Sequence, residues 1–567
     1  MRRTCHLFIA AMSLIGKVGA AADGAGPSPP VDYGPVIAEL RDLLPREMAR
    51  LDIPCLSIAL VDDQRVVWKA GFGFQDRDRK IPATEETVYR VGSISKLFTA
   101  LAVLQLDEAK VLDIDAPIVR YAPEMTFEDP FSSREPITLR RLMSHRAGIL
   151  RESPVGSYFD DSGPGIEATV KSIIGTRLVY PVGEKAKYSN LGPTVAGYII
   201  EKVTGTPFAQ HMERRVLGPL GMTSSSYLPD KEAVRRNLAC AFMIDFEGRY
   251  FPAPTFSLGT LPAGNLYSSV TDLSRFLEMI FAGGKVGEAT IVKPETLERM
   301  FTVQAAGQGS SFGLGFFVSR MWNRRVVSHT GAVYGFASAI FALPDEKLGV
   351  VVLNDVDCAN GFNDKIVKTA LRLLLRRKCQ ADVPPLPEPM KEGRADLEEY
   401  AGRYSAGNRD AWIAVKGGSL EIRFLGVLHP VLYTARDSAL ADDRLGYGLV
   451  FDFLRDETGR VSGFRSGDAQ YKRVSAGSPT SEVPERFRKL VGQYGWPHNI
   501  LKVYVKEGRL TCTVEWFFEY PLEEVGPLSY SFPDYGLYEG EKIEFIEDAA
   551  GRIVEARMAT VPFRRLP

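Results

Sequence analysis

Three short motifs in a fixed order constrain this chain of 567 residues more than its composition does. Residues 93–96 read Ser-Ile-Ser-Lys, residues 188–190 read Tyr-Ser-Asn and residues 329–331 read His-Thr-Gly. Ser93 follows a strand-like stretch and a glycine, and apolar residues then recur at helical spacing. We therefore expect Ser93 at the start of a helix, with Lys96 one turn further along the same face.

The first motif contains the groups that acyl transfer requires. A serine hydroxyl is a weak nucleophile until a base takes its proton, and the charge of Lys96 would favour deprotonation of an acid beside it. The free N–H groups at a helix N-terminus can also stabilise an oxyanion. Taken alone, this pattern is common by chance, and Ser93 could be only a helix cap.

The second motif supplies a candidate general base, Tyr188. A phenol that acts as a base near neutral pH needs a pKa well below its ordinary value, and we expect Lys96 to lower it. Asn190 could hydrogen-bond a substrate amide and Lys96 at once. It could equally cap the helix that follows, and such a cap would hold both side chains in place.

The third motif follows a run with strand character. Gly331 would let a substrate backbone lie close to the strand edge, while His329 and Thr330 present donors toward it. We expect the N–H of Ala332 and that of Ser93 to form an oxyanion hole.

The three motifs, together with residues 142–148 and 264–269, resemble those of the beta-lactamase-like serine hydrolases. This group includes class C beta-lactamases, D-Ala-D-Ala carboxypeptidases, D-aminopeptidases and family VIII-type esterases. The resemblance covers residues 36–378. It implies an α+β fold: an antiparallel sheet with helices on both sides, and a helical region that packs against it.

The resemblance also implies roles for the motif residues. Ser93 would be the acylated nucleophile, Lys96 and Tyr188 would share the proton transfers, and Asn190 and His329 would bind substrate. Beta-lactamases of this type usually carry Lys where this chain has His329, and a neutral imidazole is a weaker anion site. We therefore expect a peptidase or an esterase rather than a beta-lactamase.

For the catalytic domain we expect one antiparallel sheet that joins strands from both ends of the domain. The strands are expected at residues 56–61, 65–71, 314–319, 325–329, 337–343 and 348–354. The site would lie where this sheet meets the helices that carry Ser93, Lys96 and Tyr188.

Past the catalytic region the sequence repeats. Residues 402–404 recur 90 residues later as residues 492–494, with Gly and Tyr at matching positions. Short alternating strands predict two copies of an all-β antiparallel, barrel-like module. The resemblance implies that such modules can cover the catalytic cleft, although they could serve only stability or oligomerisation.

The expected division of the chain begins with a positively charged and then apolar leader typical of a signal peptide. In order, we expect a signal peptide at 1–22, a linker at 23–35, the catalytic domain at 36–378, a Pro-rich linker at 379–393, module 1 at 394–474, a linker at 475–484 and module 2 at 485–567. The leader predicts a periplasmic or secreted protein, although Lys17 interrupts its apolar stretch.

Composition excludes several other classes. A net charge of −1 gives no general attraction to nucleic acid, and no run after the leader is long and apolar enough to predict a membrane span. The six histidines, among which His145 is interpreted as structural, are not spaced for a metal site, so no metal or cofactor is expected. Six cysteines without a CxxC pair do not indicate a disulfide framework.

The sequence thus predicts a serine hydrolase that acts on amide bonds of small peptides, which could include D- or unusual residues, as in the hydrolase of linearised microcystin. A carboxylesterase is the nearest alternative, and a binding or assembly protein on the same fold is another. A G-x-S-x-G motif makes Ser311 a rival nucleophile, but its context lacks the strand before and the helix after that the elbow requires. The expected partner is a small molecule or short peptide, and a homo-oligomer is left open.

Overall fold

The computed structural model describes residues 31–304, 312–390, 396–474 and 483–567. The expected signal peptide, most of the linker that follows it, Ser311 and most of the linker between the two modules lie outside these residues.

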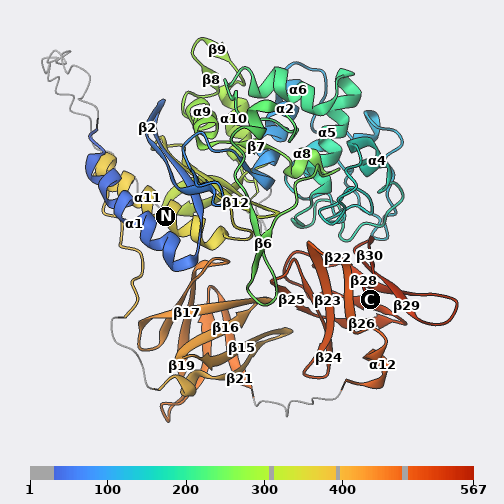
Figure 1. Ribbon diagram of the computed structural model, residues 1–567. Coiled ribbons are helices and arrows are strands. Elements are labelled where there is room, and N and C mark those ends of the chain that lie inside the picture. The colour runs from blue at the N-terminus through green and yellow to red at the C-terminus, as the bar shows by residue number, and fades with distance from the viewer. Residues whose placement is uncertain (1–30, 305–311, 391–395, 475–482) are drawn as a thin grey trace, which may run out of the picture.

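A seven-stranded antiparallel sheet forms the centre of the catalytic domain (Figure 1). Its order is β10-β11-β12-β13-β1-β2-β3, so strands from both ends of the domain are joined as expected. Strands β12 and β13 are buried throughout and read as continuous apolar runs, because both of their faces are covered by helices. The strands are β1 (Cys55–Asp62), β2 (Arg65–Asp76), β3 (Ile81–Pro82), β10 (Phe317–Met321), β11 (Arg324–Val333), β12 (Phe336–Leu343) and β13 (Leu348–Asn354).

Helices cover the two faces of this sheet. Helices α1 (Gly34–Leu51) and α11 (Asn360–Cys379) lie side by side on one face, and α9 (Val270–Phe281) packs on the other (Figure 1). Beyond α9, the helical region is built around α2 (Ser95–Glu108) and α5 (Leu191–Thr204), which pack on each other through buried apolar side chains. The α+β fold is therefore confirmed.

Short elements complete the catalytic domain. They are β4 (Tyr89–Arg90), η1 (Gly92–Ile94), η2 (Ile118–Arg120), α3 (Leu139–Met143), α4 (Ile166–Lys171), α6 (Phe208–Met212), η3 (Glu213–Leu217), α7 (Glu232–Arg235), β5 (Phe242–Ile244), β6 (Tyr250–Pro252), α8 (Leu261–Gly264), β7 (Tyr267–Ser268), β8 (Lys285–Val286), β9 (Ala289–Thr290) and α10 (Pro294–Phe301).

Module 1 is a closed antiparallel barrel that follows the short helix η4 (Leu397–Tyr400). Its strands are β14 (Gly402–Ala406), β15 (Arg409–Lys416), β16 (Ser419–Phe424), β17 (Val427–Ala435), β18 (Ser438–Asp442), β19 (Tyr447–Arg455), β20 (Val461–Ser466) and β21 (Ala469–Val474). Strand β21 pairs with β14, so the described barrel leaves no free edge.

Module 2 is also antiparallel but divides into two sheets, β22-β23-β24-β25 and β26-β27-β28-β29-β30. After helix α12 (Glu485–Arg488) come β22 (Gly492–Trp496), β23 (Asn499–Lys506), β24 (Arg509–Val514), β25 (Phe518–Pro521), β26 (Glu523–Gly526), β27 (Ser529–Ser531), β28 (Lys542–Glu547), β29 (Ile553–Met558) and β30 (Val561–Arg564). A single bridge between Tyr494 and Arg565 joins the two sheets on one side. The predicted all-β modules are thus confirmed, and module 1 is the copy that closes completely.

The repeated sequence makes the same contacts in both modules. The buried hydroxyl of Tyr404 donates to the carbonyl of Tyr400 at 2.7 Å, and that of Tyr494 donates to the carbonyl of Leu490 at the same distance. Near the end of each copy, an arginine donates to backbone carbonyls ahead of the first strand. These are Arg473 to Glu399 and Ala401, and Arg565 to Lys489 and Val491.

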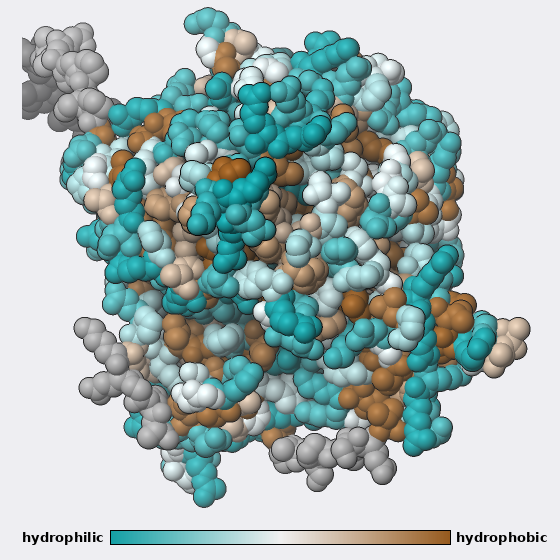
Figure 2. Space-filling model, viewed as in Figure 1, coloured by the Kyte–Doolittle hydropathy of each residue, from teal (hydrophilic) through white to brown (hydrophobic). Residues whose placement is uncertain are grey.

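The two modules lie side by side beneath the catalytic domain, and the β5–β6 hairpin reaches down between them (Figure 1). The Phe251 ring packs on Trp516 of module 2, and the Tyr250 hydroxyl accepts a hydrogen bond from Arg444 of module 1. The face in view is mostly hydrophilic, with brown patches on the sides of both modules (Figure 2). No helix in the described ranges is long and apolar enough to cross a bilayer.

We predict that Tyr494→Phe and Tyr404→Phe each lower the unfolding free energy of their module by about 1 kcal/mol, because a buried carbonyl loses its donor. Urea denaturation followed by circular dichroism measures both variants. Equal losses are expected from the equal contacts, and an unchanged midpoint in either variant would contradict the assigned repeat.

Candidate active site

Ser93 and Lys96 lie together as the sequence predicts. Ser93 sits in η1, directly ahead of α2, and its Oγ is 2.8 Å from Nζ of Lys96. Lys96 is 2% exposed, and Nζ also donates to the Ala263 carbonyl at 2.8 Å. Burial, helped by the positive charge of Arg151, holds the pKa of Lys96 well below its ordinary value. Burial therefore favours the neutral form of the amine beside the serine hydroxyl.

The pKa of Tyr188 is shifted in the direction opposite to the one expected. Burial raises its pKa to about 12, and this outweighs the opposing effects of its hydrogen bond with Ser93 and of the Arg151 charge. The prediction that Lys96 lowers the pKa of Tyr188 is wrong, because Lys96 loses its own charge in the same desolvated site. At neutral pH the phenol is a proton donor.

The Tyr188 ring is held between several neighbours. The His145 ring lies 4.4 Å away between centroids, Nζ of Lys96 lies 5.0 Å from the Tyr188 ring centre and Cζ of Arg151 lies 5.5 Å from it. Nδ1 of His145 accepts a hydrogen bond from the N–H of Ser189 at 3.2 Å. His145, interpreted from the sequence as structural, is thus a support for the second motif.

The third motif can contact the turn that carries Ser93 because β10 begins only at Phe317. The β10–β11 pairing runs only as far as Phe317 and Ser328, so residues 329–333 are free on that side. There β11 packs against η1. A Cβ placed on Gly92 would lie 3.1 Å from the N atom of Ala332, so the Ser93 turn and Ala332 are in close contact.

Glycine is needed at position 331 for a reason that the sequence did not predict. A Cβ there would lie 2.2 Å from the Val91 carbonyl oxygen and 3.1 Å from the N atom of Ser93. The approach of the chain to itself therefore requires glycine at this position. This approach places the backbone of Ser93 next to that of Gly331 and Ala332, where the predicted oxyanion hole would lie.

His329 offers an acceptor rather than the expected donor. Its Nδ1 lies 2.6 Å from the Thr330 carbonyl, which can only accept, so the proton belongs on Nδ1 and Nε2 is left with a lone pair. Nε2 is buried without a partner among the described residues. Burial lowers the pKa of His329 to about 3, so the ring is neutral.

Asn190 also makes different contacts. It stands at the N-cap of α5, but its amide donates to Oε1 of Glu152 at 2.5 Å and not to Lys96. The N–H of Leu191 is instead accepted by the Ser189 hydroxyl at 3.1 Å. The expected Asn190–Lys96 contact is therefore wrong, and Asn190 instead orients a buried carboxylate.

A cavity of about 500 Å³ collects these groups. Seven predicted site residues line it: Ser93, Tyr188, Asn190, His329, Thr330, Gly331 and Ala332. Both modules contribute to its wall through Val427, Leu445, Glu515, Phe518 and Leu537. A larger crevice, of about 740 Å³, lies between the catalytic domain and the two modules, but none of the motif residues line it. The modules therefore cover the cleft that holds Ser93.

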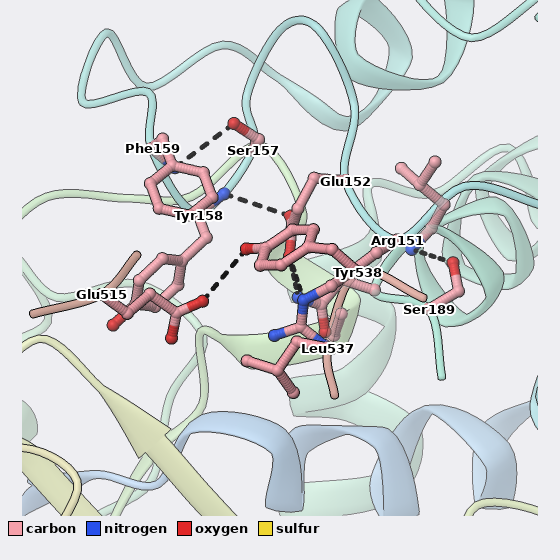
Figure 3. Close-up of polar contacts among 12 residues, drawn as sticks. Arg151, Glu152, Ser157, Tyr158, Phe159, Ser189, Glu515, Leu537 and Tyr538 are labelled. Atoms are coloured by element: carbon pink, nitrogen blue, oxygen red, sulfur yellow. Dashed lines mark hydrogen bonds and ion pairs between the residues drawn. The ribbon is translucent and has the colours of Figure 1, made fainter. Parts of the chain in front are cut away.

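One part of the cavity wall is a charged cluster that the motifs do not include (Figure 3). Arg151 lies 3.5 Å from Glu152, and Glu152 also accepts from the N–H of Tyr158. From module 2, the Tyr538 hydroxyl donates to Glu515 at 3.1 Å, and the Tyr538 ring centre lies 5.6 Å from Cζ of Arg151. No local sequence pattern marks these residues, because they come from loops far apart in the chain.

Module 2 also contacts the loops that flank the site through a buried ion pair and a hydrogen bond. Nζ of Lys187 and Oε1 of Glu541 form an ion pair at 2.5 Å, with both side chains at most 1% exposed. The same carboxylate accepts from the N–H of Arg151 at 3.0 Å. Glu541 therefore ties the residue next to Tyr188 to the loop that carries Arg151.

A family model described as Beta-lactamase matches residues 40–360, which is more than half of the chain, so the protein belongs to this family of serine hydrolases. The chain is 23% identical to Protein flp of Staphylococcus aureus (strain MRSA252) over 320 residues. That match covers 56% of this chain and 63% of the relative, less than two thirds of its length. It is 28% identical to Beta-lactamase-like protein 2 of Dictyostelium discoideum over 382 residues, covering 64% and 68% of the two chains.

Solved structures share the fold. The octameric penicillin-binding protein homologue from Pyrococcus abyssi aligns over 77% of this chain and 99% of its own, with 27% identity and a TM-score of 0.55. D-amino acid amidase from Ochrobactrum anthropi SV3, solved with L-phenylalanine amide, aligns over 60% and 98% with 22% identity and a TM-score of 0.52. The likeness to the amidase is evidence of fold alone.

We predict that Gly331→Ala separates β11 from the Ser93 turn and costs about 1–3 kcal/mol of stability through overpacking. The rate at which a fluorophosphonate labels Ser93 should fall by more than this loss of stability explains, because the backbone N–H groups of Ser93 and Ala332 move apart. Gly165→Ala is the control, since nothing lies within 4 Å of its added Cβ. Normal labelling of the Gly331 variant would contradict the assigned packing.

We predict that Glu541→Gln lowers the unfolding free energy by about 3–5 kcal/mol, because it leaves the Lys187 charge buried without a counter-charge. The double variant Lys187→Met with Glu541→Met should recover much of that loss. Denaturation midpoints of the single and double variants measure the coupling. Additive losses in the double variant would show that the pair does not act as a unit.

Proposed function

We propose that this protein is a serine hydrolase that cleaves amide bonds of small peptides through an acyl-enzyme on Ser93. The observation that carries the proposal is the 2.8 Å contact between Oγ of Ser93 and Nζ of a desolvated Lys96. A neutral lysine amine is a base of the right strength for a serine proton, and burial is the ordinary means of producing one.

In the first step, Oγ of Ser93 attacks the substrate carbonyl while its proton moves to Nζ of Lys96. The carbonyl π electrons move to oxygen, and the N–H groups of Ser93 and Ala332 stabilise the resulting oxyanion. The tetrahedral intermediate carries one negative charge, and Lys96 now carries one positive charge.

In the second step the C–N bond breaks, and the leaving nitrogen needs a proton. The Tyr188 phenol, protonated at neutral pH, donates it and regains one from Lys96, which returns to neutral. The amine departs, and the acyl-enzyme remains as an ester of Ser93. Water then attacks this ester while the same groups take its proton, and Ser93 leaves with a proton restored.

The same geometry bears on three alternatives. A site of this kind would also attack esters, so carboxylesterase activity is the second candidate, favoured by the apolar lining that Phe312, Phe317 and Leu258 give the cavity. Beta-lactamase activity is not favoured, because neutral His329 cannot pair with an antibiotic carboxylate. A pure binding role would not require the Ser93–Lys96 contact.

The experiment that tests the proposal is intact-mass analysis of the protein and Ser93→Ala after incubation with a fluorophosphonate. The protein would then be assayed with L- and D-peptides, p-nitrophenyl esters and nitrocefin. We expect one adduct, lost in Ser93→Ala, and the fastest turnover with peptides. A protein that is neither labelled nor active on any substrate would favour the binding role. Faster turnover of esters than of peptides would favour the carboxylesterase.

The octameric homologue also supports the proposal that this protein forms a homo-oligomer, which light scattering would measure.

We predict that fluorophosphonate labelling reaches its maximum rate at a pH below the ordinary lysine pKa of about 10. The pKa of Lys96 is lowered, so the neutral base is present well below the ordinary lysine range of about 10. Labelling should fall as pH drops through this lowered pKa. Rate constants measured across pH test this, and a rate that still rises tenfold per pH unit up to about pH 10 would mean that the pKa of Lys96 is not lowered.

We predict that Tyr188→Phe slows amide hydrolysis by about 10²–10³-fold, because the leaving amine loses its proton donor. A p-nitrophenyl ester should lose much less, because p-nitrophenolate leaves without a proton. The ratio of kcat/KM values for the two substrates measures the effect. An equal loss for both substrates would place Tyr188 on the attack step instead.

A further inference from the structure

We propose that the Ser338 hydroxyl positions the two N–H groups of the oxyanion hole, those of Ser93 and Ala332, by holding the turn that carries Ser93 against strand β11. Ser338 is 1% exposed and is not one of the described residues that line the cavity, so it is a positioning residue and not a catalytic one. The inference rests on the proposed function, because it concerns the same acylation site.

The first observation is a hydrogen bond that joins the sheet to the Ser93 turn. Oγ of Ser338, on β12, donates to the Val91 carbonyl at 2.8 Å. The same carbonyl accepts from the N–H of Ile94 at 3.2 Å, which closes the turn η1 around Ser93. A carbonyl oxygen has two lone pairs and can accept both bonds. The Ser338 hydroxyl therefore holds the acceptor on which the shape of this turn depends.

The second observation is the partner of Ser338 across the sheet. Its backbone is paired with Gly331 of β11, and Ala337 is paired with Ala332. The side chain of Ser338 thus reaches the turn ahead of Ser93, while its backbone lies opposite the residue before Ala332. One residue contacts both segments of the oxyanion hole and sets the separation between them.

The third observation gives a reason for the glycine of the His-Thr-Gly motif. A Cβ on Gly331 would lie 2.5 Å from Oγ of Ser338 and 2.2 Å from the Val91 carbonyl oxygen. The hydrogen bond between Ser338 and Val91 therefore occupies the space that a side chain at position 331 would need. Glycine leaves this space free, because it has no Cβ.

The fourth observation is the hairpin that fixes this register. Tyr334 and Gly335 join β11 to β12, and their φ values are 35° and 81°. Positive φ at both central residues is what a two-residue type I′ turn requires. The Tyr334 ring stacks on Tyr158 with centroids 4.6 Å apart, which stabilises a conformation that is rare for tyrosine. A slip of one residue would turn the Ser338 side chain to the other face of the sheet, so the hairpin decides which residue meets Val91.

The test compares Ser338→Ala with the unmodified protein in the rate at which a fluorophosphonate labels Ser93. We expect the second-order rate constant to fall by about 10- to 100-fold, because a small displacement of oxyanion donors has a steep effect on rate. Ser274→Ala is the matched control and should be labelled at the normal rate. Its buried hydroxyl also donates to a backbone carbonyl, that of Val270, but it lies on α9 and is not among the described cavity residues. Each variant is assayed at a temperature at which circular dichroism shows it folded.

A second readout separates positioning from loss of a substrate contact. Phenylboronic acid accepts Oγ of Ser93 on boron, the serine proton passes to Lys96, and one boron-bound oxygen of the tetrahedral adduct is directed toward the oxyanion hole. Its inhibition constant should rise in Ser338→Ala by about the factor by which labelling slows. With any substrate that is turned over, kcat should fall while KM changes by less than about threefold. A raised KM with an unchanged kcat would overturn the positioning role.

Two further variants test the hydrogen bond itself. Ser338→Cys keeps the shape of the side chain but has only a weak donor, so it should lose most of the labelling rate that Ser338→Ala loses. In Gly331→Ala the added methyl takes the space of the same hydrogen bond. Combining it with Ser338→Ala should therefore slow labelling by less than the product of the two single effects.

The outcomes distinguish the two proposals. A normal labelling rate in Ser338→Ala overturns the positioning role and leaves the serine hydrolase standing. A full rate in Ser338→Cys overturns it too, since packing alone would then explain the effect, and so do fully multiplicative losses in the double variant. Absence of labelling in the unmodified protein removes the hydrolase and this inference together.

Discussion

The desolvated contact between Lys96 and Ser93 is the interaction on which the rest of the site depends. A lysine in water would be charged and could not take a proton, so α2, α8 and the loops around them must bury Nζ completely. The same burial raises the pKa of Tyr188 and lowers that of His329. One environment therefore sets a base, a proton donor and a neutral ring side by side.

Burial of this site is shared between three parts of the chain. The catalytic domain supplies the nucleophile, and both modules supply wall residues, with Glu541 of module 2 tied to Lys187 and to the N–H of Arg151. A buried ion pair contributes little net stability compared with apolar packing, but it is costly to break and fixes one arrangement. The two modules thus form part of the wall of the catalytic cleft.

The expectations that failed depend on surroundings that the sequence does not record. Tyr188, His329 and Asn190 were each given roles that assume a charged Lys96 or an open site, but desolvation neutralises the lysine, and Glu152 takes the Asn190 amide. The close approach of Gly331 to Val91 and to the N atom of Ser93 was not foreseen either. Signs of pKa change and close approaches depend on which groups surround a residue, and spacing along the chain does not record this.

The sequence by itself determined what is local or strongly periodic. The Ser93–Lys96 turn, the strands of the sheet and the repeated Tyr404 and Tyr494 contacts follow from helical spacing, alternation and internal repetition. Only the tertiary structure decided that Arg151, Glu152 and Glu515 meet beside Ser93, because these residues lie on loops of separate domains. Loops show no hydrophobic periodicity, and which loop residues come into contact depends on how the domains pack against each other.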